Sequence, residues 1–433
     1  MRKGRPGLDL QWQILIGIGL GIGTGLLLGR LAGSGVQPHA IKLVRQLFTY
    51  GGDIFLRLLR MVIVPLVFSS VFMAVVNLGD VRKLGSIGRH TLLYYMATTA
   101  LAVLTGLLVV NLIHPGAGID PAVLERLDIR KGIPESVNAM QAGSRNLAVI
   151  ILETMLGIIP PNIAAAFSEG NVLQVIFFAL FTALVAGLAG EPARQLVGVI
   201  AGIDRIMQMA VELIMRIAPV CIFLLVAALA MELGIPALAA LARYALTVLA
   251  GLMLHACVTL PLLVFILTRT RPLHLLKAVL PALFTAWSTA SSAATIPVTL
   301  ECLNKRAGID KRISSFVVSL GATINMDGTA LYESVAVIFI AELLGVPLAL
   351  PQQLVIFFTA TLAAIGAAAI PGAGLITMGI VLSAVGLPLE GIGLILVIDR
   401  LLDQFRTSVN VWGDITAAAV VGALDMRTPQ GVK

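Results

Sequence analysis

Charged side chains are scarce in this chain. Of its 433 residues, 12% are charged and 58% are hydrophobic, and the mean hydropathy is +0.98. A soluble globular domain carries about twice that share of charged residues. The composition therefore excludes a soluble globular protein and predicts one that crosses a membrane several times, with membrane lipid as a partner.

Cysteine is equally rare. The three cysteines, Cys221, Cys257 and Cys302, lie in or beside apolar stretches, without paired spacing and without a histidine cluster nearby. This pattern argues against a disulfide framework and against a zinc site. We interpret the three thiols as buried side chains of the apolar interior.

The net charge of +7 does not form a nucleic-acid-binding stripe, because the basic residues collect in short loops between apolar segments. By the positive-inside rule these loops are cytoplasmic, and so are both termini of a chain in the inner (plasma) membrane. The loop residues are Arg2, Lys3, Arg5, Arg82, Lys83, Arg89, Arg269, Arg271, Lys277, Lys305, Arg306, Lys311 and Arg312.

Long apolar runs predict the first membrane segments. A span needs about 20 residues, and the runs cover 11–32, 41–78, 83–113, 146–189, 195–231 and 235–268. The first run has no convincing cleavage site after it, so we expect a span rather than a removed signal peptide. The polar loop at 114–145 is expected to be external.

Two later segments are broken in the middle. Residues 272–302 and 351–384 are apolar but are interrupted by small, turn-forming residues at 288–297 and 366–374. Each is too short to cross twice, so a hairpin that enters and leaves on one side fits better. A full span follows each hairpin, at 310–343 and 390–425. A repeated broken helix followed by a helix is typical of inverted-repeat transporters, whose sites lie at the hairpin tips.

Ionisable residues at membrane depth point to the same region. At about 100° per residue, five polar side chains of the last span share an arc of about 80°. They are Asp399, Asp403, Arg406, Asn410 and Asp414. Such groups are costly in a bilayer and usually mark a functional site. Arg400 lies about 100° from Asp399 and is expected to point away from this arc.

The span before the second hairpin carries a second polar cluster, Asn325, Asp327 and Thr329, beside glycines. Oxygen atoms of such side chains and of an unwound helix are ligands for a hard cation such as sodium. The alternative is that these side chains only hydrogen-bond to neighbouring helices.

Four motifs in order resemble one family over nearly the whole chain. They are the Asn-Met-Asp-Gly-Thr run at 325–329, the serine-rich first hairpin tip, Ile-Pro-Gly-Ala-Gly at 370–374, and the polar arc of the last span. The chain is similar to the dicarboxylate and amino acid:cation symporters, which include excitatory amino acid transporters and prokaryotic glutamate transporter homologues. The resemblance implies an all-α protein with eight transmembrane helices and two re-entrant hairpins, a homotrimer with an elevator mechanism.

The resemblance also implies a division into domains. A scaffold would comprise 1–80 and 116–233, and a transport domain would comprise 81–115 and 234–427.

Substrate roles carry over by position. Arg406 would bind the side-chain carboxylate of an acidic amino acid, and Asp403 its ammonium group. Asn410 and the hairpin tips would take the α-carboxylate. The remaining lining residues implied by the resemblance are Ser291, Ser292, Thr329 and Thr407.

Three sodium sites would follow from the same resemblance. One uses Gly321 and Asn325 carbonyls with Asn410 and Asp414. A second uses the carbonyls of Thr323 and Met326 with those of 364–367. The third combines Asn325 and Asp327 with Tyr95, Thr98 and Thr99.

Glu333 is an additional carboxylate in this span. Desolvation there favours its neutral form, and a glutamate at this position resembles the proton carrier of proton-coupled relatives. The open alternative is a structural hydrogen bond.

Other functions fit less well. A C4-dicarboxylate carrier is disfavoured because Asp403 would repel a plain dicarboxylate. An enzyme is not expected, since no histidine neighbours Ser291 or Ser292 in the sequence and no GxSG motif occurs. An anion channel would leave the substrate-binding pattern unexplained.

Overall fold

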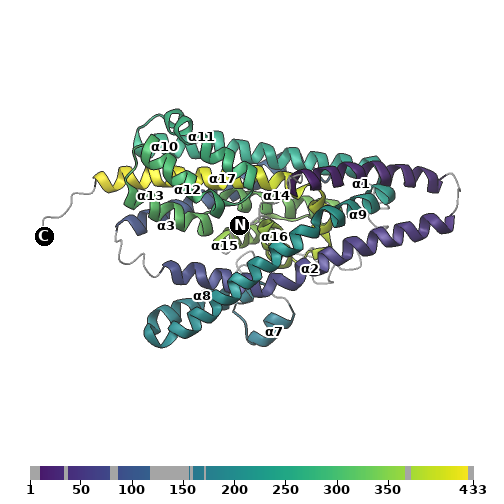
Figure 1. The fold of residues 1–433 in the computed structure, drawn as a ribbon, viewed down its shortest axis with the longest axis horizontal. Helices are drawn as coiled ribbons and strands as arrows, with labels where there is room; N and C mark the ends of the chain where they lie inside the picture. Colours follow the sequence, from purple (N-terminus) through teal and green to yellow (C-terminus); the bar gives the residue numbers. More distant parts are fainter. Residues whose placement is uncertain are drawn as a thin grey trace, which may run out of the picture.

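The computed structural model describes residues 10–33, 38–78, 86–117, 156, 159–169, 172–365 and 372–427. Within these residues all regular secondary structure is helical, which confirms the predicted all-α class (Figure 1). The main α-helices are α1 Leu10–Gly33, α2 Pro38–Leu78, α3 Ser86–Ile113, α7 Ile163–Ser168, α8 Val172–Ala189, α9 Arg194–Leu254, α10 Leu260–Thr268, α11 Pro272–Thr289, α12 Ser292–Glu301, α13 Lys311–Ile324, α14 Asp327–Leu344, α15 Leu350–Ile365, α16 Ala373–Ala384 and α17 Ile392–Arg427.

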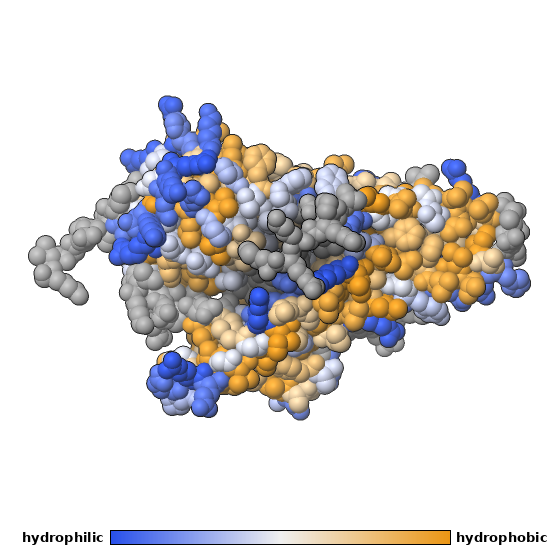
Figure 2. All heavy atoms as spheres, in the orientation of Figure 1, coloured by the Kyte–Doolittle hydropathy of each residue, from blue (hydrophilic) through white to orange (hydrophobic). Residues whose placement is uncertain are grey.

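Close backbone contact joins α1 to α9. A Cβ atom added at Gly17 would lie 2.7 Å from the Pro219 carbonyl oxygen, and one at Gly21 would lie 2.8 Å from that of Phe223. Glycines four residues apart allow two membrane helices to approach in this way. Together with α2, these helices form the extended apolar part of the molecule on the right of Figures 1 and 2.

The more compact part is built around α14 and α17. Every residue of α14 except Glu342 is buried, so this helix lies at the centre of its surroundings. The long helix α17 packs against α9, α10, α11, α13 and α14 (Figure 1). This packing brings the polar residues of α17 beside those of α13, α14 and α3.

The predicted helix breaks are present where the structure describes them. α11 ends at Thr289, its C-cap Ala290 has φ of 48°, and Ser291 is the N-cap of α12. The backbone also unwinds at Asn325 and Met326, between α13 and α14. α15 and α16 flank the second predicted tip, whose residues 366–371 lie outside the described part. A membrane entry and exit on one side remains a prediction for both hairpins.

The boundary between two predicted spans lies within one continuous helix. The apolar runs predicted at 195–231 and 235–268 correspond to two candidate spans, Glu191–Met231 and Leu238–Thr268, although the backbone of α9 stays helical between them. The proline at 236 did not interrupt the helix.

The predicted count of eight spans remains untested. In the described residues, four helices are long and apolar enough to span by composition, namely those containing Trp12–Ala32, Ser86–Ile113, Glu191–Met231 and Leu238–Thr268. Most of the loop predicted to be external, 118–145, and both chain ends lie outside the described residues.

Candidate functional site

The polar arc of α17 is buried. Asp399, Asp403, Arg406, Asn410 and Asp414 all lie in the interior of the compact part. The helical period alone places them on one face, and the packing of α13, α14 and α16 against that face removes them from solvent. Buried charges require partners, so the site is described from its pairs.

Arg406 lies at the centre of one cluster and is 1% exposed. Its Nη1 donates to Asp399 Oδ1 at 3.0 Å, and its Nη2 donates to Asp403 Oδ1 at 2.6 Å. The guanidinium also lies 4.1 Å from the centre of the Tyr332 ring, whose hydroxyl donates to Asp399 at 2.7 Å. Two carboxylates and one aromatic ring therefore hold a planar cation in one orientation.

Arg400 corrects one sequence expectation. It was expected to point away from the arc, but it is buried and its Nη1 lies 3.4 Å from Asp403 Oδ2. Residues three apart on a helix lie on neighbouring turns, so a long arginine side chain can reach across. The same Asp403 oxygen accepts the Gly372 amide at 3.0 Å, which connects α17 to the start of α16.

The start of α16 also approaches the guanidinium of Arg406. A Cβ atom added at Gly374 would lie 2.6 Å from Nη1 and 2.9 Å from Nη2. Only a residue without a side chain fits this position without displacing Arg406. Gly374 belongs to the Ile-Pro-Gly-Ala-Gly motif, so the described part of this motif lies against the polar arc.

Glu333 is fully buried on α14. Neither of its carboxylate oxygens makes a well-formed hydrogen bond in the described part of the chain, and the polar groups acting on it are the Thr377 hydroxyl and the Arg406 guanidinium. Glu333 is therefore a buried carboxyl group whose pairing within the described chain is incomplete.

Asn410 bridges α17 to the first turn of α14. Its Oδ1 accepts the Gly328 amide at 2.7 Å, and its Nδ2 donates to the Thr329 hydroxyl at 3.3 Å. Thr407 is buried on the same face of α17. These groups lie between the Arg406 cluster and the carboxylate of Asp414, one turn further along.

A second cluster forms where α3 meets the unwound segment. The Thr99 hydroxyl donates to Asp327 Oδ1 at 2.8 Å, and the Thr98 hydroxyl donates to Asn325 Oδ1 at 3.4 Å. Asn325 Nδ2 in turn donates to Asp414 Oδ1 at 3.0 Å. The cluster therefore contains two buried carboxylates linked by hydroxyl and amide groups.

No lysine or arginine pairs with Asp327 or Asp414 among the residues that the structure describes. That part of the chain also contains no group of three His, Cys, Asp or Glu side chains that could hold a metal. The available ligands are oxygen atoms of carboxylate, amide and hydroxyl groups, which suit a hard monovalent or divalent cation. A cation entering here would neutralise charge that the protein leaves uncompensated.

Comparison with known proteins agrees with this arrangement. The sequence profile of the sodium:dicarboxylate symporter family matches residues 10–424. The chain is 37% identical to an excitatory amino acid transporter of Caenorhabditis elegans over 90% of this chain and 83% of the relative. It is 38% identical to mouse excitatory amino acid transporter 3 over 94% of this chain and 85% of the relative. Human excitatory amino acid transporter 2 is 37% identical, over 92% and 77% respectively.

This chain belongs to the sodium:dicarboxylate symporter family. The resemblance read from the four motifs is confirmed. Family membership is consistent with a transporter rather than an enzyme.

Sequence reasoning missed His255 in this symporter. It is fully buried in the π-helical segment His255–Thr259, and its Nε2 lies 3.4 Å from Asp327 Oδ2. π-helical segments occur frequently at functional sites. The next residue accepts the indole N–H of Trp412 at 3.0 Å through its carbonyl, which fixes this segment against α17. A lone histidine inside an apolar run was the signal that could have found it.

The remaining predicted sodium ligands differ in how close they lie to the carboxylates of the site. A Cβ atom at Gly321 would collide with Asp414 Oδ1 and the Tyr95 hydroxyl, so these three residues are neighbours. The Tyr95 hydroxyl itself donates to the Val317 carbonyl at 2.7 Å. Thr323 is exposed, and its hydroxyl donates to Leu320. The partner segment predicted for Thr323 and Met326, 364–367, extends beyond the described residues after Ile365.

The first hairpin tip contributes a helix cap. Ser291 is the N-cap of α12 and its hydroxyl accepts the Ala294 amide at 3.2 Å. Ser292, the first residue of α12, is buried. The structure places the tip on a helix that packs against α17, although it records no hydrogen bond between Ser292 and the polar arc.

Proposed function

We propose that this chain imports acidic amino acids, aspartate or glutamate, together with sodium ions. The observation that carries the proposal is the buried pair of Arg406 and Asp403, 2.6 Å apart at the junction of α17, α14 and α16. Its two charges match the side-chain carboxylate and the ammonium group of such a substrate. The printed names of the relatives, excitatory amino acid transporters, agree.

Substrate binding would replace the ion pair between Arg406 and Asp403 with ion pairs from each residue to the substrate. Arg406 offers a planar fork to the substrate carboxylate, and Asp403, freed from Arg406, accepts the ammonium group. Asn410 and the start of α12, with Ser291 and Ser292, take the α-carboxylate. Because each buried charge keeps a partner throughout, the exchange avoids leaving an unpaired charge in the site.

Thr329 and Thr407 complete the proposed pocket. Thr329 is already hydrogen-bonded to Asn410 at 3.3 Å, so a substrate carboxylate beside Asn410 would lie within reach of both. Thr407 is the residue next to Arg406 on α17.

Sodium binding is supported by the uncompensated carboxylates. Asp327 and Asp414 have hydroxyl and amide neighbours but no arginine or lysine partner in the described chain. A cation held by Asp327, Asn325, Thr98 and Thr99 would balance the negative charge that an acidic substrate brings. We propose that Tyr95 belongs to this first site. A second sodium site would be formed by Gly321, Asn325, Asn410 and Asp414. A third would use the carbonyls of Thr323 and Met326.

A proton is proposed as a further coupled ion, carried by Glu333. Its burial, incomplete hydrogen bonding and proximity to Arg406 support the proposal. The protonated carboxyl group adds no charge, whereas its ionised form would compete with substrate for Arg406.

The proposed mechanism is an elevator. The proposed scaffold comprises 1–80 and 116–233, and the proposed transport domain comprises 81–115 and 234–427. The packing of α1 and α2 against α9, and of α17 against α11, α13 and α14, supports this division. Eight spans, two re-entrant hairpins, a homotrimer in the plasma membrane and cytoplasmic termini complete the proposal.

The test is uptake into proteoliposomes under separate sodium, proton and potassium gradients. Labelled aspartate is compared with succinate, a plain C4-dicarboxylate and the alternative substrate. We expect sodium-driven uptake of aspartate and little of succinate. Uptake of aspartate that ignores the sodium gradient contradicts the coupling, and preferred uptake of succinate favours the dicarboxylate carrier.

Two reciprocal variants test the roles of the pair. Arg406→Lys keeps the charge that Asp399 and Asp403 need but loses the bidentate fork, so the aspartate Kd should rise by about 10- to 100-fold. Asp403→Asn should lose aspartate and gain succinate, because the repulsive carboxylate is removed. Arg312→Gln, a surface arginine of α13, is the control and should change neither. Unaltered aspartate binding by Arg406→Lys would refute the assignment.

A further inference from the structure

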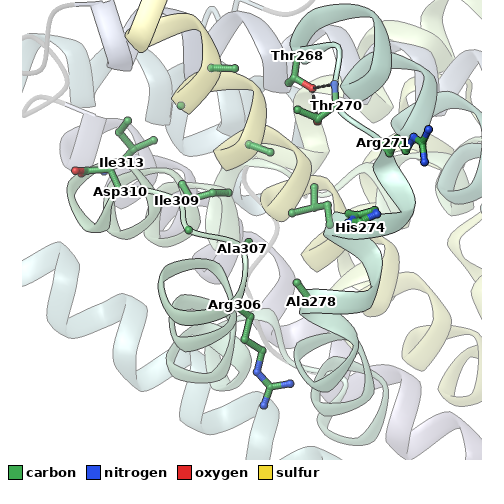
Figure 3. Close-up of a pocket in the computed structure, with 15 residues that line it drawn as sticks. Thr268, Thr270, Arg271, His274, Ala278, Arg306, Ala307, Ile309, Asp310 and Ile313 are labelled. Carbon is green, nitrogen blue, oxygen red and sulfur yellow. Dashed lines mark hydrogen bonds between the residues drawn. The ribbon is translucent and has the colours of Figure 1, made fainter.

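A second cavity lies at one end of the compact part, away from the polar arc. It has a volume of about 820 Å³, within the range of about 300–1,000 Å³ that is usual for ligand pockets. Its walls come from the start of α11, the segment between α12 and α13, and the last turns of α17 (Figure 3). The apolar lining includes Leu275, Ala278, Ile309, Ile313 and Ala423.

Two arginines flank this apolar lining. Figure 3 shows Arg271 and Arg306 on different sides of the cavity, each with its guanidinium group turned outward. Neither side chain takes part in the ion pairs of the described chain, which involve other arginines. Both guanidinium groups are therefore available to an external anion.

The acidic residue at the cavity does not cancel this charge. Asp310 is the N-cap of α13, and its Oδ1 accepts the amides of Arg312 at 2.7 Å and Ile313 at 3.4 Å. One carboxylate oxygen is thus committed to the helix end. With two arginines and His274 at the rim, the cavity favours a negative ligand.

The charge of the surface around the cavity indicates which class of negative ligand fits it. The hydrophilic surface in Figure 2 gathers at this end of the molecule, near the labels of α10 and α11 in Figure 1. Exposed Arg269 and Lys277 add to its basic character, whereas Lys305 is paired with Glu301 at 3.1 Å. Basic loops lie on the cytoplasmic side, where the leaflet carries anionic lipids, and basic pockets between helices there bind lipid head groups.

We propose that this cavity binds one anionic phospholipid of the cytoplasmic leaflet. An acyl chain lies among Leu275, Ala278 and Ile313, and the phosphate lies at the rim between Arg271 and Arg306. A soluble anion would leave the apolar lining unused, whereas an uncharged lipid would leave both arginines without a partner. The ligand that satisfies both parts of the cavity is amphiphilic and negative.

The binding site connects helices that carry the polar arc. α11 leads to the first hairpin tip at Ser291, and α17 carries Arg406. A lipid between α11, α13 and α17 therefore fills space at the base of the hairpin.

The experiment is photolabelling in proteoliposomes. The protein is reconstituted in phosphatidylcholine with a trace of phosphatidylglycerol that carries a photoactivatable group on one acyl chain, and labelled peptides are identified by mass spectrometry. We expect labelling within 272–283 and 306–313. Labelling spread evenly over outward-facing helices would overturn the proposal, because it would indicate only surrounding lipid.

Variants separate the cavity from general charge attraction. Arg271→Gln with Arg306→Gln should reduce labelling at the cavity by about 10-fold or more, since the loss of a hydrogen bond between charged groups weakens binding by about that factor. Arg269→Gln with Lys277→Gln removes the same charge from exposed residues at the same end that do not line the cavity, and should reduce labelling less than threefold. Equal losses in both double variants would overturn the site.

The apolar half of the site is tested separately. Ala278→Trp fills the cavity without changing charge and should abolish labelling of 306–313. Inorganic phosphate at millimolar concentration should not compete. Retained labelling in Ala278→Trp, or full competition by phosphate, would contradict a bound lipid. Elution and thermal melting of each variant report folding, and neither readout depends on transport, so the result stands apart from the proposed substrate.

Discussion

Gly374→Ala is the substitution that most directly tests how α16 and α17 form the site. The added Cβ atom would lie 2.6–2.9 Å from Nη1, Cζ and Nη2 of Arg406, whereas ordinary contacts begin near 3.4 Å. The guanidinium must therefore move by about 0.5–0.8 Å. Any such movement would also disturb the 2.6 Å hydrogen bond from Arg406 Nη2 to Asp403 Oδ1.

The expected effect is on substrate affinity. A displaced guanidinium cannot align both N–H groups on a carboxylate, and losing one charged hydrogen bond costs about 1.5–3 kcal/mol. That corresponds to about a 10- to 150-fold rise in the aspartate Kd. The internal pairs with Asp399 and Asp403 weaken as well, which offsets part of the loss, so we expect a value near the lower end.

The assay is calorimetric titration of aspartate into purified protein at saturating sodium. Gly379→Ala is the matched control, because it lies on the same helix and its added Cβ would meet its nearest neighbours at 3.5–3.8 Å. The control should bind aspartate as the wild type does and should be neutral or slightly stabilising. If Gly374→Ala binds aspartate within twofold of the control while both melt normally, the proposed contact between Arg406 and substrate is wrong.

Two further predictions concern the coupled ions. Thr99→Val removes the hydroxyl that donates to Asp327 at 2.8 Å, so the sodium concentration for half-maximal uptake should rise by about 5- to 30-fold. The control is Thr105→Val, whose hydroxyl donates to the Leu101 carbonyl of its own helix, and it should leave this concentration unchanged. Equal effects of the two substitutions would exclude a specific role of Thr99 in sodium binding. Glu333→Gln keeps the shape of a neutral carboxyl group but cannot release a proton, so aspartate should still bind while the dependence of net uptake on a proton gradient disappears. An unchanged response to pH would exclude Glu333 as the carrier.

The local features of the site were largely predictable. The helical period alone predicts that Asp403, Arg406 and Asn410 share one face, because the angle per residue hardly varies between α-helices. Glycine and polar residues at 321–329 predict a weakened helix, and the backbone unwinds at Asn325 and Met326. The membrane class follows from composition, since transfer from water depends on side-chain chemistry before any fold is known.

The contacts across the fold were not predictable in the same way. Thr99 and Asp327 are distant in sequence and Arg406 meets Gly374 across two helices, and these distances depend on how whole helices pack. Arg400 was misplaced because the angular projection of a helix ignores the reach of a long side chain.

The sequence by itself determined that this protein lies in a membrane, that it is helical, and which face of its last helix carries charge, since hydrophobicity and helical geometry are local properties. Tertiary structure decided which charges pair and which remain uncompensated. Arg406 is paired with carboxylates of its own helix. Among the described residues, Asp327 accepts from Thr99 and lies near His255, and Asp414 accepts from Asn325, but neither has a lysine or arginine partner. Coulombic balance depends on distance in space, and helix packing alone sets that distance.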